Sequence, residues 1–342
     1  MSGIKAGYRT RAGKRVQLRL GLAGLNFGTK VILPALEGIP GFRLAAVCAR
    51  DPVKACAVAQ KWKIPKVETN YKKLALDPEL DALILALPPD IQVRLISHAA
   101  KAGKHLFCEK PLAHNLRAGR RALRVVRNAK VRHGIDFLFT EIPAWRALAR
   151  LLRKGRIGRP LRAVYRWRIR RGRGPLPSGS WKMHATRGGG LAGNFLCHVF
   201  HNLEFLLGPV HGPAEARHQD DRCCRFSVRV GAGVQVDVHL EIRTAGLSRH
   251  AIRIFGTKGE LGLCQRGQDY ARGFFLRHRL MGRQNSFRRI PVLSSWQGGD
   301  GRIRPVRALL RRFQNAIRSG KEMRPNLEDA GRIQAYLEQF RR

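Results

Sequence analysis

The sequence predicts a two-part α/β fold: a doubly wound parallel sheet first, then an α/β domain with a large, mostly antiparallel open sheet. Up to about residue 130, strand-like apolar runs alternate with helical patterns, which is typical of βαβ units. Beyond that point several segments alternate apolar and polar residues with period two, as half-exposed antiparallel strands do. A chain of 342 residues is long enough for two cores. We expect domains over 14–131 and 132–342, and leave open whether the C-terminal helices pack back on the first.

In the first part, a buried strand over 16–23 leads into a glycine-containing turn and a helical pattern. A second apolar strand covers 42–48. Asp51-Pro52 then predicts a helix start, with Asp51 as N-cap and Pro52 in the first helical position. The other elements expected here are strands within 80–87, over 105–108 and over 136–139, and a helix over 91–102.

The second part begins with an expected helix that ends near Gly155. Gly256–Gly259 has the composition of a hairpin turn between two strands. The elements expected here are a helix over 144–154, strands over 161–169, 225–230, 234–242 and 251–255, and helices over 306–319 and 327–340.

The net charge of +43, from 66 basic and 23 acidic residues, is the unusual bulk property. It invites a nucleic-acid or membrane-surface interpretation. The local clusters over 166–173, 277–289 and 302–312 hold at most one aromatic residue each, too few for a base-stacking platform. We interpret the excess as a bias of the whole sequence, and expect only nonspecific nucleic-acid contact at low salt.

Other motifs are notable by their absence. No apolar run approaches the roughly 18 residues of a membrane helix, and the N-terminus lacks the apolar core of a secretory signal. The seven cysteines include no C-x-x-C pair, which favours a cytoplasmic protein. No metal site is expected, because His198 and His201 have no third ligand at a recognisable spacing.

The turn after the first strand is a candidate dinucleotide site, since glycines let the pyrophosphate approach and a helix N-terminus offers free N–H groups. Gly24 is present, Asn26 stands where a second glycine is expected, and Gly28 lies one residue early. Asn tolerates positive φ, so we expect the turn to survive, with Phe27 also at the cofactor. By itself the turn is also compatible with an ordinary strand–helix connection.

The end of the second strand bears on the choice between NADP and NAD. Ala49 replaces the acid that would bind a ribose 2′-hydroxyl, and Arg50 offers a planar donor fork to a 2′-phosphate. We therefore favour NADP over NAD. The alternative is that Arg50 is one more arginine in an arginine-rich chain.

Glu109-Lys110-Pro111 follows a strand in the segment GKHLFCEKPLA, Gly103–Ala113. With Ala86–Pro89, Trp181, Arg187–Gly190, Gly256–Gly259 and Asn326–Gln334, this segment resembles the glucose–fructose oxidoreductase / inositol dehydrogenase / rhizopine-catabolism (Gfo/Idh/MocA) family over about Val16–Phe340. The resemblance implies an NAD(P)-binding Rossmann domain and an active site in the crevice between the domains. It also implies a homodimer or homotetramer, with the outer face of the second sheet as a natural subunit interface.

The resemblance also implies roles for single residues. Lys110 would hold the nicotinamide carboxamide or the substrate oxygen, and Pro111 would fix the loop through a cis bond. His198 would move the hydroxyl proton, with Asn194 four residues earlier on the same helix face. Pro88, Pro89 and Glu109 would line the cofactor, and Trp181 would stack on a sugar face.

The sequence departs from the family pattern at three positions. Asn194 stands where the family has an acid, His201 replaces a later acid, and Gln92 stands where histidine is common. Each site residue also has a structural alternative: Lys110 as a surface lysine, and His198 and Trp181 as core residues. We interpret His201, His184 and Glu141 as pocket-wall or structural residues.

The function implied is reversible hydride transfer between a nicotinamide and a sugar-like or polyol-like hydroxyl or ketone. A non-catalytic, dinucleotide-sensing regulatory protein of the same fold is the alternative from another class. A reductase of an aromatic or tetrapyrrole carbonyl-like substrate is a third option.

Overall fold

The computed structural model describes residues 17–170, 180–219, 222–282, 286–292 and 298–341, and these form two compact units. The first comprises the described residues up to Asp136, Thr186–Gly188 and Val306–Gln334, and the second comprises the rest. The expected domain start at residue 14, strand residue Val16, and parts of two basic clusters (171–173 and 283–285) lie outside the described residues.

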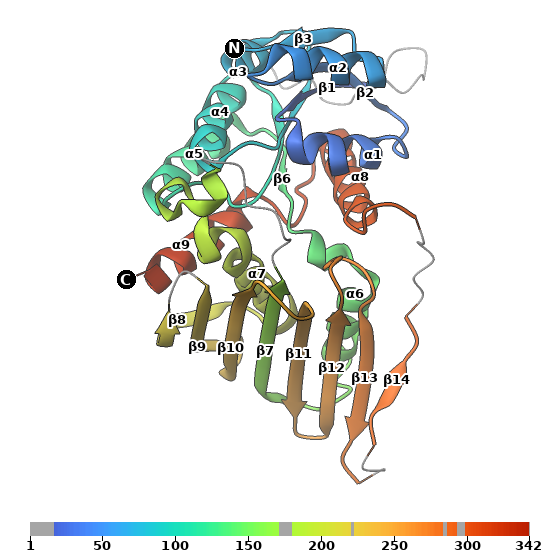
Figure 1. Cartoon of the computed structure of the whole chain (residues 1–342), viewed down its shortest axis with the longest axis vertical. Helices are drawn as coiled ribbons and strands as arrows, with labels where there is room; N and C mark the ends of the chain where they lie inside the picture. Colours follow the sequence, from blue (N-terminus) through green and yellow to red (C-terminus); the bar gives the residue numbers. More distant parts are fainter. Residues whose placement is uncertain (1–16, 171–179, 220–221, 283–285, 293–297, 342) are drawn as a thin grey trace. The chain divides into compact units, whose positions relative to one another are not determined.

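The first unit is built on a six-stranded sheet in the order β3-β2-β1-β4-β5-β6, with every neighbouring pair parallel. Strands β1, β2, β3 and β6 of this sheet are labelled in Figure 1. This confirms the expected doubly wound sheet. The chain order reverses between β1 and β4, and such a switch point is where open α/β sheets bind ligands. The strands are β1 Leu18–Ala23, β2 Phe42–Cys48, β3 Lys66–Glu68, β4 Ala82–Leu85, β5 His105–Cys108 and β6 His133–Ile135.

The helices of this unit begin at residues that the sequence marks. Asp51 accepts a hydrogen bond from the Lys54 amide at 3.1 Å and Pro52 is the first helical residue, which confirms the expected cap. After β1, a wider turn η1 (Gly28–Ile32) continues into α1 (Leu33–Leu36). The others are α2 Pro52–Trp62, α3 Tyr71–Leu76, α4 Pro89–Lys101 and α5 Leu116–Ala129.

The expected strand over 136–139 is wrong. The last strand ends at Ile135, the Asp136 amide still donates to the carbonyl of Cys108 at 2.9 Å, and η2 (Leu138–Glu141) is a 3₁₀ turn. Phe137, Leu138 and Phe139 are all buried. A short apolar segment that is buried on every side has the composition of a strand, so periodicity could not separate the two.

The C-terminal helix α8 (Ile303–Ser319) completes the first unit. Phe313 packs against Phe42 of β2 and Phe107 of β5, with ring centroids 6.5 and 5.8 Å apart. The guanidinium of Arg307 donates to the carbonyls of Pro34 and Ala35, at 2.7 and 3.0 Å. Those carbonyls belong to the last turn of α1, where a helix lacks internal donors and favours positive charge. The final helix is α9, Leu327–Arg341.

The second unit is built on an eight-stranded sheet in the order β14-β13-β12-β11-β7-β10-β9-β8. Its pairs are antiparallel except β7 with β10, which confirms the mostly antiparallel sheet and adds a parallel pair that was not predicted. The strands are β7 Pro160–Arg170, β8 Val210–Gln219, β9 Cys223–Val230, β10 Val234–Arg243, β11 Arg249–Gly256, β12 Gly259–Arg266, β13 Phe275–Leu280 and β14 Arg288–Ile290.

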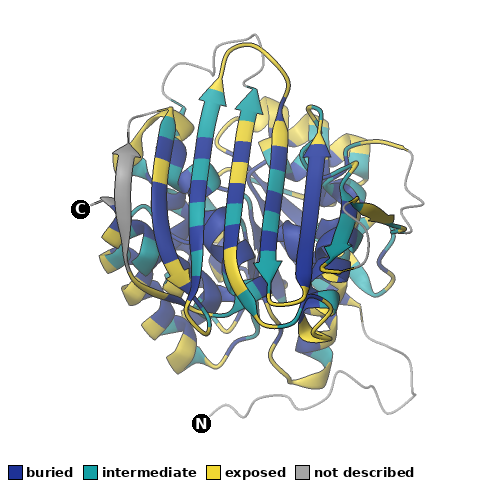
Figure 2. Ribbon diagram, turned by 90° about the horizontal axis from the view of Figure 1, so that it is seen from below, coloured by how far each residue is buried: buried dark blue, intermediate teal, exposed yellow. Residues whose placement is uncertain are grey.

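The two faces of this sheet differ sharply. Ala163, Tyr165 and Trp167 of β7 are buried on the inner face, which α6 (Pro143–Arg153) and α7 (Cys197–Leu207) cover. Arg166 and Arg168, on either side of Trp167 in sequence, are exposed on the outer face. Figure 2 views the sheet from the outer side, and no described helix covers it there. No helix in the described part of the chain is long and apolar enough to cross a membrane.

Candidate functional site

The turn after β1 is shaped for close approach of another group. Gly24 has φ +92°, and a Cβ on it would lie 2.2 Å from the carbonyl oxygen of Ala86, so no other residue fits. A Cβ on Gly28 would lie 3.2 Å from the Leu22 side chain. Backbone amides at the start of the following helix are therefore presented beside the ends of β1 and β4, as a pyrophosphate requires.

Asn26 plays a different part from the one expected. Outside glycine, the described residues with positive φ are Lys63 and Lys130, so the expectation that Asn26 preserves the turn by tolerating positive φ is wrong. Asn26 already lies in the helix, and its side-chain oxygen accepts a hydrogen bond from the Lys54 ammonium at 2.6 Å. Phe27 follows it as the N-cap residue of η1.

The end of β2 carries positive charge. Ala49 is 8% exposed, whereas Arg50 is exposed beside it. Burial raises the pKa of Tyr71, at the start of α3, and hydrogen bonds from Arg50 oppose this shift. With Lys54 tied to Asn26, two cations lie near the glycine turn. This arrangement suits a phosphate better than a neutral ribose hydroxyl.

The side chain of one buried residue holds the Glu-Lys-Pro loop that follows β5. Gln92 of α4 is fully buried, and its amide donates to the carbonyls of Glu109 at 2.7 Å and Pro111 at 3.2 Å. Both anchors flank Lys110, and the Lys110–Pro111 bond is cis, as expected. Pro88 precedes α4 as its N-cap residue, and Pro89 opens the helix. Gln92 thus fixes the backbone from which Lys110 projects.

A segment from the middle of the chain also belongs to the first unit. Arg187 donates to Asp90 of α4 at 3.1 Å. Gly188 has φ +86°, and a Cβ on it would lie 2.9 Å from the Cα of His114 and 3.0 Å from Pro89. The Arg-Gly pair therefore lies directly against the helix start that follows β4.

In the second unit, His198 is buried on α7 among aromatic rings. Its ring lies edge-on to Phe139 at 5.1 Å and to Phe137 at 6.0 Å, and 6.2 Å from Trp167. His201 stacks on Phe137 at 4.1 Å. Such walls exclude water and restrict the imidazole to one orientation.

Behind this ring cluster lies a fully buried polar chain. The hydroxyl of Tyr165 lies 2.5 Å from Nε2 of His250, and Asn202 donates to the same hydroxyl at 3.0 Å. His250 also stacks on Trp167 at 4.2 Å, with ring planes 4° apart. Burial lowers the pKa of His250 to about 3, so this imidazole is neutral and rigidly held.

Asn194 and Trp181 lie in one small structure. The amide of Asn194, in η5 (Ala192–Leu196), donates to the carbonyls of Lys182 and Gly190, both at 2.8 Å. Trp181 is partly exposed in a 3₁₀ turn, and a Cβ on Gly189 would lie 2.1 Å from its carbonyl oxygen. Asn194 therefore fixes the segment that carries Trp181.

Two family models match this chain. An oxidoreductase family model with an NAD-binding Rossmann fold matches residues 18–137, and the GFO/IDH/MocA C-terminal domain matches residues 145–262. The chain belongs to the GFO/IDH/MocA family of oxidoreductases. Membership confirms the expected class of NAD(P)-dependent oxidoreductase.

Relatives of this GFO/IDH/MocA protein span its length. An uncharacterized oxidoreductase of Synechocystis sp. is 26% identical over 335 residues, 92% of this chain and 90% of that protein. A structure of levoglucosan dehydrogenase with NADH and levoglucosan has TM-score 0.83 and 20% identity, covering 95% of this chain and 96% of that one. A 3-ketoreductase from Actinomadura kijaniata, with TDP-benzene and NADP, has TM-score 0.74 and 22% identity, covering 95% and 97%. The two structures show the fold.

The candidate site residues therefore fall into two groups, one in each unit. The first unit brings together the glycine turn, Arg50, the Pro-Pro pair and Lys110, and the second brings together His198, His201 and the aromatic walls. His184 is exposed, while Glu141 is buried and paired with Arg146 at 2.7 Å.

Sequence reasoning missed two contributions. One is Lys54, which lies three residues after the cap Asp51. Its position in the first turn of α2 could have indicated a cation near the glycine turn. The other is the polar chain of Tyr165, Asn202 and His250. Asn202 and His250 follow Tyr165 by 37 and 85 residues, so no local spacing connects the three.

Proposed function

We propose that this protein is an NADP-preferring dehydrogenase or reductase that transfers a hydride between C4 of the nicotinamide and a sugar-like or polyol-like carbon. Lys110 polarises the substrate oxygen, and His198 takes or returns the hydroxyl proton. The observation that carries this proposal is the double anchor of Gln92 on the Lys110 loop, because a surface lysine needs no such support.

The described residues fit a dinucleotide. The Gly24 turn leaves space that any Cβ would fill, and a helix start follows it. The bound nicotinamide would supply the hydride acceptor or donor. Gly24, Gly28 and Phe27 would hold its pyrophosphate, and Pro88, Pro89 and Glu109 would line it.

The preference for NADP rests on Ala49 and the cations beside it. A buried methyl group at the end of β2 offers no carboxylate to a ribose 2′-hydroxyl, and Arg50 and Lys54 would pair with a 2′-phosphate. Fluorescence titration with NADPH and NADH, at physiological and high salt, tests this. Tighter salt-tolerant NADPH binding supports it, and tighter NADH binding overturns the preference.

Oxidation of a hydroxyl needs one group that binds its oxygen and one that takes its proton, and Lys110 of the first unit and His198 of the second are the candidates for these two roles. Asn194 uses its amide on two backbone carbonyls, which favours a positioning role beside the substrate. Trp181, partly exposed on the segment that Asn194 holds, would stack on a sugar face. A sugar-like substrate is also supported by the similarity to levoglucosan dehydrogenase, whose structure contains NADH and levoglucosan.

A screen of sugars and polyols, followed by nicotinamide absorbance, tests turnover. Lys110→Ala should abolish most turnover while nucleotide binding persists. Nucleotide binding with no turnover on any substrate favours the dinucleotide-sensing alternative, and turnover unchanged in Lys110→Ala removes Lys110 from the mechanism.

We also expect the protein to form a homodimer or a homotetramer. Light scattering of the purified protein would measure its molar mass and so its oligomeric state. We also expect a cytoplasmic location, because the seven cysteines include no C-x-x-C pair.

A further inference from the structure

Three buried polar side chains on the inner face of the eight-stranded sheet are joined by hydrogen bonds. Tyr165 of β7, His250 of β11 and Asn202 of α7 are each at most 1% exposed. The Tyr165 hydroxyl lies 2.5 Å from Nε2 of His250, and the Asn202 amide donates to that hydroxyl at 3.0 Å. This polar chain therefore connects helix α7 to two neighbouring strands of the second unit.

The hydrogen bonds of the polar chain all run in one direction. The amide nitrogen of Asn202 is only a donor, so the Tyr165 oxygen accepts from it and gives its single hydrogen to Nε2 of His250. Nε2 is therefore unprotonated, and the imidazole is the neutral tautomer with its hydrogen on Nδ1. Burial lowers the pKa of His250 to about 3, which agrees with a neutral ring. Each member of the chain thus fixes the orientation of the next.

Stability alone does not require these hydrogen bonds. Replacing both partners of a buried hydrogen bond by apolar groups of the same shape changes stability little, because the bonded groups have also lost their bonds to water. A fully bonded buried network instead favours one arrangement of its elements, since its bonds have a fixed length and direction. Apolar packing loses this uniqueness before it loses stability. The polar chain therefore fixes the rotation of α7 on the sheet.

His198 lies one helical turn before Asn202 on α7. Residues i and i+4 lie on the same face of a helix, so the two side chains leave α7 toward the same side. A hydrogen bond that holds Asn202 consequently limits the rotation of the helix at His198.

Two aromatic rings also connect His198 with His250. Phe139 lies edge-on to both imidazoles, with ring centroids 5.1 Å apart in each case. Trp167 stacks on His250 at 4.2 Å and lies 6.2 Å from His198. The imidazole that the polar chain orients therefore supports two of the rings that surround His198.

We propose that the three residues of the polar chain are positioning residues for His198, and that they hold its imidazole in the orientation that transfers the hydroxyl proton. They act through α7 and the two aromatic rings. The inference rests on the proposed function, in which His198 takes or returns that proton, and it names what sets the geometry of the step. A general base must lie within hydrogen-bond reach of its proton, so a small displacement of the ring lowers the rate more than the affinity.

The test is steady-state turnover of the full chain on the substrate that the sugar and polyol screen identifies. Tyr165→Phe removes the central hydroxyl and keeps the ring. We expect kcat to fall by about tenfold or more, while KM and the Kd for NADPH stay within about twofold of wild type. His250→Gln should keep most of the turnover, because its amide oxygen can accept the Tyr165 hydrogen in place of Nε2. His250→Leu offers no acceptor and should lose kcat as Tyr165→Phe does.

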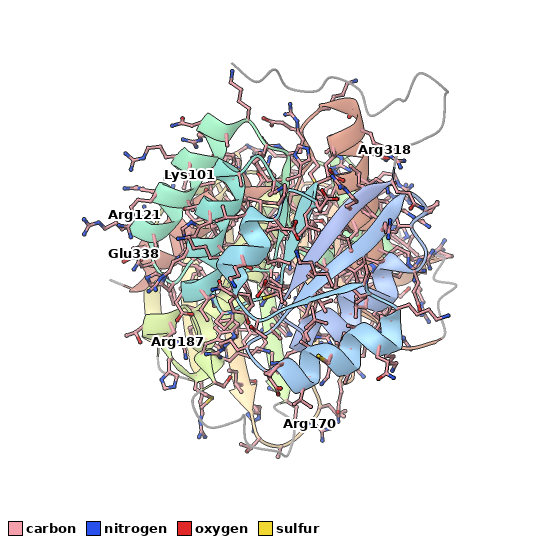
Figure 3. All side chains as sticks on the ribbon, turned by 90° about the horizontal axis from the view of Figure 1, so that it is seen from above. Lys101, Arg121, Arg170, Arg187, Arg318 and Glu338 are labelled. Carbon is pink, nitrogen blue, oxygen red and sulfur yellow. The ribbon has the colours of Figure 1, made fainter. Side chains whose placement is uncertain are left out.

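Two control variants remove comparable hydrogen bonds from the same elements. Tyr336→Phe removes a hydroxyl that donates to Glu204 of α7 at 2.9 Å, on the side of the helix away from Asn202. Ser248→Ala removes the acceptor of the Arg170 amide, a 2.9 Å link between β7 and the residue before β11, and Arg170 is labelled in Figure 3. Both controls should turn over like the wild type. A loss of kcat in the controls equal to that in Tyr165→Phe overturns the proposal.

A double-mutant cycle separates this inference from the proposed function. His198→Gln should lower kcat by about 100-fold or more, the contribution of a general acid–base group. In that background Tyr165→Phe should have no further effect, because its effect passes through His198. An additive loss in the double variant overturns the positioning role alone. Unchanged turnover in His198→Gln contradicts the proposed role of His198 and the positioning role together.

A second measurement needs no substrate. Hydrogen–deuterium exchange of the full chain, read by mass spectrometry, should be faster over residues 197–202 in Tyr165→Phe than in wild type. Ser248→Ala should leave exchange in this segment unchanged. Equal exchange over α7 in Tyr165→Phe and wild type overturns the proposal, whether or not a substrate has been found.

Discussion

The side-chain amide of Gln92 donates a hydrogen bond to the carbonyl oxygen of Glu109, at 2.7 Å. The same nitrogen reaches the carbonyl of Pro111, so helix α4 holds the main chain on both sides of Lys110. A neutral, fully buried side chain thereby positions the main chain from which Lys110 projects.

Gln92→Leu should lower the free energy of unfolding by about 1–3 kcal/mol, because two buried carbonyls lose their donor. Turnover should fall more steeply than nucleotide affinity, since the Lys110 loop loses its position. Gln314→Leu is the matched control: Gln314 is also buried and donates to a carbonyl, that of Pro40, at 3.1 Å. The control should lose stability but keep turnover, and equal kinetic losses would show that Gln92 is only structural.

Arg50→Ser should weaken NADPH binding by about tenfold or more, the value of one charge-assisted hydrogen bond, and leave NADH binding unchanged. Arg43, exposed near the other end of β2, provides the control substitution Arg43→Ser. Titration by nucleotide fluorescence measures both. A parallel loss of NADPH affinity in the two variants would mean that general charge attracts the nucleotide.

Gly24→Ala should abolish nucleotide binding and destabilise the first unit, because a Cβ would lie 2.2 Å from the carbonyl of Ala86 at φ +92°. Gly103→Ala is the control, since Gly103 has φ +74° but nothing within 4 Å of a Cβ. The control should lose about 1–2 kcal/mol from backbone strain alone. Thermal melting and NADPH titration of the two proteins separate the clash from the strain.

Acid should destabilise the second unit through His250. Its pKa is lowered by burial to about 3, so below about pH 6.5 the unfolded chain takes up a proton that the folded chain does not. Stability from this group is therefore full above pH 6.5 and falls as the pH drops, by about 2 kcal/mol at pH 5. His250→Gln should flatten the decline of melting temperature from pH 7 to 5, and His98→Gln, at an exposed position, should not. Identical slopes in all three proteins would contradict the assignment.

Features with a strong local signal could be predicted from the sequence. The strands over 42–48 and 105–108 have the predicted bounds because each is a short apolar run with clear breaks on both sides. The Asp51 cap and the turn glycine Gly24 are likewise determined by their neighbours in the chain. The hydrogen bond between the side chains of Asn26 and Lys54 could not be predicted, because the two residues lie 28 positions apart in the chain.

The second half of the site depends on contacts that no spacing reveals. His250 stacks on Trp167 because β11 pairs with β7, two strands that have β8, β9 and β10 between them in the chain. The parallel pairing of β7 with β10 is equally non-local. Period two identified these segments as strands but contains no information about their order in the sheet.

The packing of Phe313 on Phe42 and Phe107, described above, determines when the nucleotide-binding unit becomes complete. That unit includes residues Val306–Gln334, so its core cannot close until the chain has been synthesised past the whole sheet of the second unit. Until then the sheet lacks α8, and the last carbonyls of α1 lack Arg307. The unit whose sheet is synthesised first is therefore completed only after the sheet of the second unit, and a premature stop anywhere before α8 leaves it without this part of its core.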